Sequence, residues 1–253
     1  MSQTTLLTTR NHPDSMDYSE FLPLLGNRAR PEPRWIEALT GVGSDEVAHV
    51  LDEMRDNLAR ERTIRDTMIE TGRTYYAQFP APLELYGITR ILNPDHIVES
   101  GVSSGISSAH FLLALKRNRK GTLHSIDYPT YSSKPKRSKA DISWTIPYGR
   151  DSGWAVPIDL RKRWDLRKGR SEELLEDLLG KIKTVDIFCH DSPWTSKHLE
   201  YELKTVQPHL RSGSIVIADN SSYNPNAVEK LAAAFSARVF HRRGSDLIGI
   251  RVP

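Results

Sequence analysis

Four acidic side chains between positions 99 and 219 are candidates for cofactor or metal chemistry. Each closes a short apolar run that has the composition of a buried strand. Because the carboxyl ends of parallel strands meet at one edge of an open sheet, where such sheets bind ligands, we expect the four carboxylates to lie near one crevice. They are Glu99, Asp127, Asp191 and Asp219.

The segment after the first of these runs has the composition of a cofactor-binding loop. It reads Glu99-Ser100-Gly101-Val102-Ser103-Ser104-Gly105-Ile106-Ser107. Glycines allow tight turns and the close approach of a ligand, and the free amides at a helix start donate hydrogen bonds. Three residues separate Gly101 from Gly105, so the full G-x-G-x-x-G fingerprint of dinucleotide folds is absent. The alternative is a turn that simply requires glycine.

Asp127 strengthens the cofactor interpretation, because it ends the next predicted strand, 28 residues after Glu99. A carboxylate in this place can accept hydrogen bonds from both ribose hydroxyls of an adenosine cofactor. A lone Asp at a strand end is more often a helix cap or a solvated residue. The glycine loop and Asp127 in one strand-helix-strand unit together predict a nucleoside cofactor.

The elements that must position these residues follow an alternation of short apolar runs and helical patterns, which is typical of a parallel sheet. The predicted strands are 96–99, 122–127, 185–191 and 214–219, with a further one near 164–166. The predicted helices are 105–117, 171–182, 195–210 and 224–236. Residues 238–243 and 247–252 predict two final strands joined by a tight turn.

The N-terminal third has a different pattern. Residues 1–43 show no sustained period and predict a loosely packed arm. A helix is expected to begin at Ser44 and to continue toward Gly72, and a second helix to begin at Pro82 and end before Pro94. We therefore predict an arm and helical extension over 1–81, whose helix offers a surface for homo-oligomers, and a cofactor-binding domain over 82–253.

Composition excludes several classes of protein. The 253 residues include 35 Lys and Arg against 32 Asp and Glu, which gives a formal net charge of +3. The single cysteine excludes an intramolecular disulfide and a Cys-rich zinc site. No apolar run approaches the roughly 20 residues that span a bilayer, so we expect a cytoplasmic protein without a membrane segment. No tyrosine has a lysine four positions later, which argues against a short-chain dehydrogenase.

Over residues 82–253 the sequence resembles the class I S-adenosylmethionine-dependent methyltransferases, in particular the small-molecule O-methyltransferases that act on catechols and sugars. The resemblance rests on VESGVSSGISS, SIDYP, KGRSEELLEDLL, DIFCHDS and HLRSGSIVIADN. It implies a Rossmann-like, doubly wound α/β fold with a seven-stranded sheet, mostly parallel with an antiparallel last strand.

The resemblance also implies where S-adenosylmethionine binds. The methionine portion would lie against Glu99 and the glycine loop, the ribose against Asp127, and the adenine edge against the turn Arg170-Ser171. Asp191 would also contact the cofactor. The loop residues in question are Gly101, Ser103, Gly105 and Ser107.

Asp191, Asp219 and Asn220 form a candidate metal site. Carboxylate and amide oxygens suit a hard cation such as Mg²⁺. Members of the metal-dependent branch are similar here, with an Asp and an Asp-Asn pair at the matching positions. A bound Mg²⁺ would lower the pKa of an acceptor hydroxyl and orient its oxygen toward the methyl group. The alternative is that Asp219 and Asn220 cap a turn and that Asp191 contacts only the cofactor.

The general base is less clearly indicated. Trp194 stands where relatives often carry His, so the remaining candidates for the base are His198 and Lys197. Asp191 is the second predicted catalytic residue. The ordinary pKa of His, near 6.5, suits proton transfer at neutral pH, which favours His198. A His in the first turn of a helix is more often structural. Without a base, the metal could suffice, or the acceptor could be an amine.

A basic insert at about 130–165 completes the picture. Residues 130–170 hold 11 Lys and Arg against 4 Asp, together with several aromatic residues. Such a surface could bind a small acceptor with an anionic group, or be only a solvated face. Nucleic acid is not expected, because no RNA-binding module accompanies the insert.

The predicted function is O-methylation of a small hydroxylated metabolite with a divalent metal. The alternatives are a metal-free N-methyltransferase and a non-catalytic module that binds a nucleoside cofactor.

Overall fold

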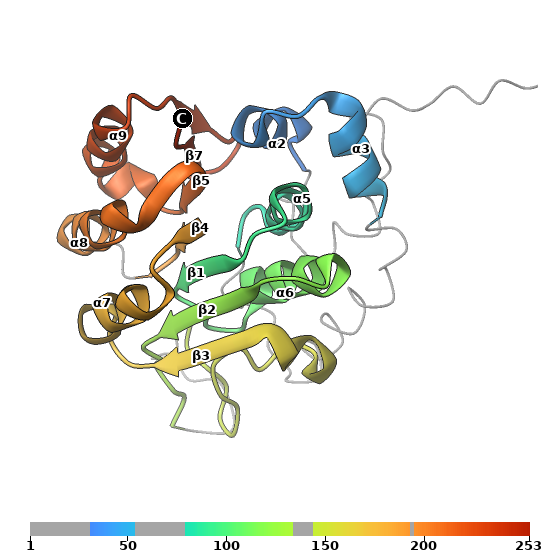
Figure 1. Ribbon diagram of the computed structural model, residues 1–253. Helices are drawn as coiled ribbons and strands as arrows, with labels where there is room; N and C mark the ends of the chain where they lie inside the picture. Colours follow the sequence, from blue (N-terminus) through green and yellow to red (C-terminus); the bar gives the residue numbers. More distant parts are fainter. Residues whose placement is uncertain (1–30, 54–78, 134–143, 193–194) are drawn as a thin grey trace, which may run out of the picture.

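A seven-stranded mixed sheet organises the chain (Figure 1). The computed structural model describes residues 31–53, 79–133, 144–192 and 195–253. The strand order is β3-β2-β1-β4-β5-β7-β6. The strands are β1 (His96–Ser100), β2 (Thr122–Asp127), β3 (Trp164–Lys168), β4 (Val185–His190), β5 (Leu210–Ala218), β6 (Val239–His241) and β7 (Ile248–Arg251).

The direction of the strands confirms the predicted topology. The first five strands pair in parallel, whereas β7, the last in the chain, lies between β5 and β6 and runs antiparallel to both. Because β1, β2, β4 and β5 are parallel, their carboxyl ends share one edge of the sheet. The four acidic residues predicted to converge therefore lie at or just beyond that edge.

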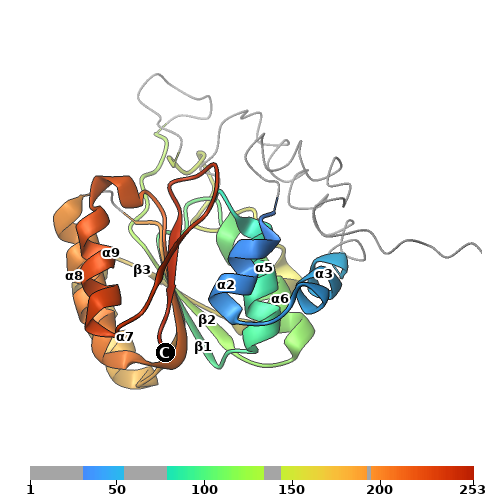
Figure 2. The same ribbon diagram turned by 90° about the horizontal axis from the view of Figure 1, so that it is seen from above.

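Helices cover both faces of the sheet, as Figure 2 shows from above. One face carries α2 (Pro33–Thr40), α3 (Ser44–Asp52), α5 (Pro82–Leu92) and α6 (Ile106–Asn118). The other carries α7 (Ser171–Ile182), α8 (Ser196–Val206) and α9 (Pro225–Ala234). Short 3₁₀ helices follow at η4 (Ile158–Arg163), η5 (Gln207–His209) and η6 (Ser221–Tyr223). Among the described residues, no helix combines the length and apolar character that a membrane span needs.

Two hydrophobic clusters, one on each face, follow from strand alternation, since successive side chains of a strand point to opposite faces. On β4, Ile187 belongs to the cluster beneath α5 and α6, and Phe188 to the cluster beneath α7, α8 and α9. β1 divides its apolar residues in the same way, with Ile97 in the first cluster and Val98 in the second. A polar residue at a strand end is thereby assigned to one face or the other.

The N-terminal segment differs from the prediction. Residues 33–40, expected within a loosely packed arm, form α2, in which Trp35, Ile36 and Leu39 are buried. The Trp35 indole Nε1 donates to the carbonyl of Phe240 on β6 at 3.0 Å. A helix of eight residues is too short for its period to stand out, and its stability comes from tertiary packing. The predicted continuation of the next helix toward Gly72 lies outside the described residues, and the oligomer surface stays a prediction.

The junction between α8 and β5 also differs. The predicted helix 195–210 ends as an α-helix at Val206, and η5, which contains Pro208, follows. β5 begins at Leu210 rather than at 214, and its register against β4 shifts between Val185 and Ile187. Gly213, at φ +85°, lies within this irregular stretch. The polar residues between Leu210 and Ser214 hid the strand start, because this irregular stretch interrupts the apolar pattern.

Candidate cofactor site

The glycine loop after β1 is held by backbone contacts to neighbouring strand ends. The Gly101 amide donates to the carbonyl of Ile126 at 2.9 Å, and the Asp191 amide donates to the carbonyl of Ser100 at 2.7 Å. Gly101 has φ +91°, and a Cβ there would collide with the Asp191 carbonyl. Glycine is therefore required at this position by the approach of the loop after β4, independently of any ligand.

Gly105 has a second packing role, which the sequence did not indicate. It precedes α6 at φ +90°, and a Cβ there would lie 2.8 Å from the Gly153 Cα. The Gly153 amide donates to the Ser103 carbonyl at 2.8 Å, and the Ala155 amide donates to the Ser104 carbonyl at 3.0 Å. The segment between β2 and β3 thus packs directly on the glycine loop.

Glu99 faces α6 and is fully buried. Its carboxylate accepts hydrogen bonds from the hydroxyls of Ser107 (2.5 Å), Ser108 (2.6 Å) and Ser125 (2.6 Å). Burial raises its pKa to about 7, against the opposing effect of these hydroxyls. Two predicted cofactor residues, Glu99 and Ser107, are therefore hydrogen-bonded to each other, and their contact with the cofactor stays a prediction. The signal was the serine spacing, since side chains on the first turn of a helix reach the preceding strand.

Asp127 lies at the end of β2 and is 8% exposed. One carboxylate oxygen accepts from the Val102 amide at 3.1 Å, and the other from the Ser152 hydroxyl at 2.5 Å. Burial raises the pKa of Asp127. Because a carboxylate offers about four acceptor positions, Asp127 retains capacity for ribose hydroxyls. Sequence reasoning missed Ser152, which stands in the insert without a motif.

Arg170 and Ser171, the two residues predicted to contact the adenine, lie in different surroundings. The Arg170 guanidinium lies over the Tyr128 ring, 4.9 Å from its centroid, and Tyr128 is 64% exposed. The Gly169 amide donates to the Asp127 carbonyl at 2.9 Å, which joins the loops after β2 and β3. The Tyr128–Arg170 pair therefore offers an exposed flat surface beside Asp127. Ser171, in contrast, is buried and its hydroxyl lies 3.1 Å from the His198 Nε2.

Asp191 and Asp219 end adjacent strands, as predicted, and the Asp219 amide donates to the carbonyl of His190 at 2.9 Å. The pKa of Asp191 is raised well above its ordinary value, first by burial and then by the negative charges of Asp219, Glu99 and Asp127. A cation at this edge would relieve that repulsion. Mg²⁺ and the positively charged groups of S-adenosylmethionine both meet this requirement.

The third predicted metal ligand is oriented by its neighbour. Asn220 is left-handed, at φ 55°, and its amide nitrogen donates to Asp219 Oδ2 at 3.2 Å. Its carbonyl oxygen is the atom that suits a hard cation. Within the described ranges, no group of three or more His, Cys, Asp and Glu side chains is arranged to hold a metal ion. Asp191, Asp219 and Asn220 would offer two carboxylates and one amide, which are donors of the kind that Mg²⁺ takes, and the metal stays a prediction.

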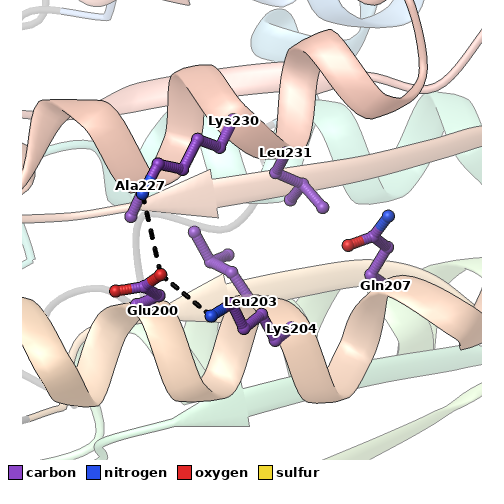
Figure 3. Close-up of a pocket in the computed structure, with 7 residues that line it drawn as sticks. All are labelled: Glu200, Leu203, Lys204, Gln207, Ala227, Lys230 and Leu231. Atoms are coloured by element: carbon purple, nitrogen blue, oxygen red, sulfur yellow. Dashed lines mark ion pairs between the residues drawn. The ribbon is translucent and has the colours of Figure 1, made fainter.

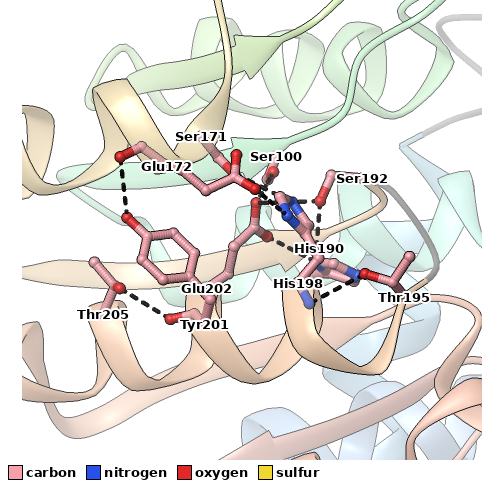
Figure 4. A network of polar contacts seen from close by, with 10 residues as sticks. All are labelled: Ser100, Ser171, Glu172, His190, Ser192, Thr195, His198, Tyr201, Glu202 and Thr205. Atoms are coloured by element: carbon pink, nitrogen blue, oxygen red, sulfur yellow. Dashed lines mark hydrogen bonds and ion pairs between the residues drawn. The ribbon is translucent and has the colours of Figure 1, made fainter.

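His198, the predicted base, lies in the first turn of α8 and belongs to a polar network (Figure 4). Its Nδ1 is 3.0 Å from Glu172 Oε1, and its Nε2 is 2.9 Å from Glu202 Oε1. The hydrogen bond to Glu202 raises the pKa of His198, with burial opposing. Both ring nitrogens of His198 thus face carboxylates, and its role as the general base stays a prediction. Trp194 lies outside the described residues.

Several charged side chains of the basic insert already contact other parts of the protein, so fewer are available to a ligand than the net charge predicts. Arg161 donates to the carbonyls of Gly153 and Val156, and its guanidinium lies 5.7 Å from the Trp164 ring centroid. Arg163 donates to the Gly121 carbonyl, and Lys168 pairs with Asp151 at 2.8 Å. These side chains hold the insert in place. The charges at Lys134, Lys136, Arg137 and Lys139 lie outside the described residues.

A shallow pocket of about 80 Å³ lies elsewhere, between α8 and α9 (Figure 3). Leu203, Ala227 and Leu231 form its apolar part. Glu200 pairs along α8 with Lys204 at 2.9 Å, and across the pocket with Lys230 of α9 at 3.7 Å. Neither the glycine loop nor the acidic strand ends line this pocket, so it is not the candidate cofactor site.

Comparisons with known proteins agree with this fold. Residues 98–221 match the model of a family described as a methyltransferase domain. The chain is similar to the O-methyltransferase from Bacillus cereus in complex with SAH, at 12% identity and a TM-score of 0.50, over 75% of this chain and 90% of that one. It is also similar to the calicheamicin methyltransferase CalS11, at 15% identity and a TM-score of 0.49, over 88% and 94% of the two chains. No curated protein shows significant sequence similarity to this chain.

The family match and the strand order define the class. Residues 98–221 are a methyltransferase domain, and the sheet has the mixed seven-stranded arrangement predicted for it. The chain therefore carries a methyltransferase domain on a sheet with the class I, Rossmann-like strand order.

Proposed function

We propose that the protein transfers a methyl group from S-adenosylmethionine to an oxygen of a small hydroxylated acceptor. The observation that carries the proposal is the convergence of the glycine loop, Asp127, Arg170 and Asp191 at one edge of the sheet. When bound, S-adenosylmethionine supplies an electrophilic methyl group on a sulfonium centre. The acceptor oxygen forms the new bond to carbon, the carbon–sulfur bond breaks, and S-adenosylhomocysteine leaves.

The residues of the site have separate tasks in this proposal. Asp127 accepts hydrogen bonds from the ribose, and the exposed Tyr128–Arg170 pair borders the adenine. Asp191 faces the positively charged end of the cofactor, whose charge would favour the ionised form of a carboxyl that burial and neighbouring carboxylates otherwise disfavour. Orientation of the two reactants in one pocket is the main source of rate, with effective molarities of about 10⁵ to 10⁸ M available from it.

Asp191, Asp219 and Asn220 would hold Mg²⁺ at the same edge. The ion would supply Lewis acidity that lowers the pKa of the acceptor hydroxyl. This arrangement needs no histidine base, in keeping with the position of His198 between two carboxylates. The acceptor proton would then leave to solvent.

Calorimetry with S-adenosylhomocysteine tests the cofactor assignment. The wild-type protein should bind it and should not bind NAD. Asp127→Ala should weaken binding by about 1.5 to 3 kcal/mol, the range for hydrogen bonds to a charged group. Asp177→Asn, on the exposed surface of α7, is the matched control and should bind as the wild type does. An unchanged affinity in folded Asp127→Ala would contradict the ribose contact.

Methyl transfer to a panel of hydroxylated and amine acceptors tests the reaction and the metal. Chelation by EDTA and Asp219→Ala should each abolish transfer while S-adenosylhomocysteine still binds. Transfer that survives both would exclude metal catalysis, and transfer confined to amines would favour N-methylation. Cofactor binding without transfer to any acceptor would favour a non-catalytic binding module.

A further inference from the structure

Glu202 on α8 is a buried carboxylate whose partners come from the ends of different strands (Figure 4). Its Oε1 accepts hydrogen bonds from the hydroxyls of Ser100, at 2.5 Å, and Ser192, at 3.1 Å. Its Oε2 lies 2.7 Å from Nδ1 of His190, at the end of β4. One side chain therefore joins the loop after β1 to the loop after β4.

Through His198, the same network also reaches Ser171, which follows the loop after β3. The His198 Nε2 lies 2.9 Å from Glu202 Oε1 and 3.1 Å from the Ser171 hydroxyl. Its other ring nitrogen lies 3.0 Å from Glu172 Oε1, on a side chain that is 48% exposed. The network thus extends from the wholly buried Glu202 to solvent at Glu172, and it contacts the start of α7 on the way.

The three tethered hydroxyls are adjacent in sequence to candidate cofactor residues. Covalent connection means that a shift of the tethered residue also shifts its neighbour. Ser100 precedes Gly101, Ser192 follows Asp191, and Ser171 follows Arg170.

We propose that Glu202 is a positioning residue, which holds the three cofactor loops in place from behind the sheet. The inference rests on the proposed placement of S-adenosylmethionine over Gly101, Asp191 and Arg170. Glu202 does not touch the cofactor, because its carboxylate lies with Ser100 and His190 on the α8 side of the sheet. Loops that are already ordered spare the ligand the entropy of ordering them, so Glu202 should act on cofactor affinity.

The charge state of Glu202 agrees with this role. Burial by itself would raise its pKa, but His190 and His198 outweigh burial, and the net effect is a lowered pKa. An ionised carboxylate accepts from all of its neighbours at once and donates to none. An apolar side chain of similar size could fill this space, yet it could not connect three loops.

Calorimetry of S-adenosylhomocysteine with the full-length protein tests the inference. Glu202→Gln keeps the shape but not the charge, and should raise Kd at least about tenfold. Ser100→Ala and Ser192→Ala each remove one tether without stranding a charge, and should raise Kd about two- to tenfold, as expected for single hydrogen bonds. Glu172→Gln is the control at the exposed end of the network and should stay within about twofold.

Steady-state kinetics separate positioning from a general loss of folded protein. Positioning predicts a raised KM for S-adenosylmethionine with kcat at saturation within about twofold of the wild type, since Asp191 and Asp219 remain. A purely structural role would instead lower the binding stoichiometry and kcat together, at an unchanged Kd, and would overturn the inference.

The serine variants decide the outcome if Glu202→Gln does not fold. Wild-type Kd values in both Ser100→Ala and Ser192→Ala, beside a wild type that binds normally, would overturn the positioning role alone. A wild type that does not bind S-adenosylhomocysteine would overturn the cofactor placement and this inference with it.

Discussion

Glu99 and Glu202 are two fully buried carboxylates on opposite faces of the same sheet, and they meet the cost of burial in opposite ways. Glu99, on the α6 face, receives three serine hydroxyls and no cation, and its pKa is raised to about 7. Glu202, on the α8 face, contacts two imidazoles, and its pKa is lowered. The neutral hydroxyls around Glu99 do not prevent its protonation, whereas the imidazoles around Glu202 stabilise its ionised form.

The comparison implies opposite responses to acid. A carboxyl whose pKa is raised by folding contributes stability below its unfolded pKa and loses it as pH rises through the folded pKa. A carboxyl whose pKa is lowered contributes stability above its unfolded pKa and loses it as pH falls through the folded pKa. Acidification should therefore increase the contribution of Glu99 to the stability of the fold and decrease the contribution of Glu202.

The largest expected effect is that of Glu202→Leu. It leaves two histidines and two serine hydroxyls without their shared acceptor, and breaking a buried ion network in this way costs about 3 to 5 kcal/mol. Urea unfolding at pH 7 measures the loss. Glu200→Leu on the same helix removes only surface ion pairs and should cost less than about 1 kcal/mol. Equal losses in the two variants would show that the network contributes no more than a surface pair.

Glu99→Gln should change how stability depends on pH. The free energy of unfolding of the wild type, relative to this variant, should fall as pH rises from about 4.5 to above about 7. A shift from 4.5 to about 7 corresponds to a change of about 3 kcal/mol at most. Urea unfolding across pH 4.5 to 8 measures the difference, with Glu173→Gln as an exposed control. A difference that does not vary with pH would contradict the raised pKa.

The smallest effect is expected for Glu172→Gln, which tests how far this carboxylate contributes to the raised pKa of His198 beside Glu202. His198 has a raised pKa, so its contribution is present below about 6.5 and is lost as pH rises through its folded pKa. Removing the Glu172 charge should cost less than about 1 kcal/mol, because this carboxylate is half exposed. Nuclear magnetic resonance titration of His198 should give a lower pKa in the variant, and an unshifted titration would show that Glu172 does not contribute.

The alternation of strands and helices was predictable because it rests on local periodicity. The helix at 171–182 has the predicted bounds, and the turn at Pro94 ends α5 as expected. α2 was not predictable, because its eight residues are stabilised by contacts with β6 and β7 far along the chain. The irregular start of β5 was missed for a related reason, since the bulge opposite Val185 is set by pairing with β4.

The sequence by itself determined the class of site: a glycine loop, an acidic residue after each of its neighbouring strands, and their shared edge. These follow from residue order, because parallel strands bring their carboxyl ends together. Only the tertiary structure decided which neighbours each side chain contacts. Strand alternation and helix packing directed Glu99 toward serines, placed His198 between Glu172 and Glu202, and brought Ser152 from the insert to Asp127. Three of these contacts, Glu99–Ser125, Asp127–Ser152 and Glu172–His198, join residues 25 or more positions apart. Over such a separation, sequence spacing carries no geometric information.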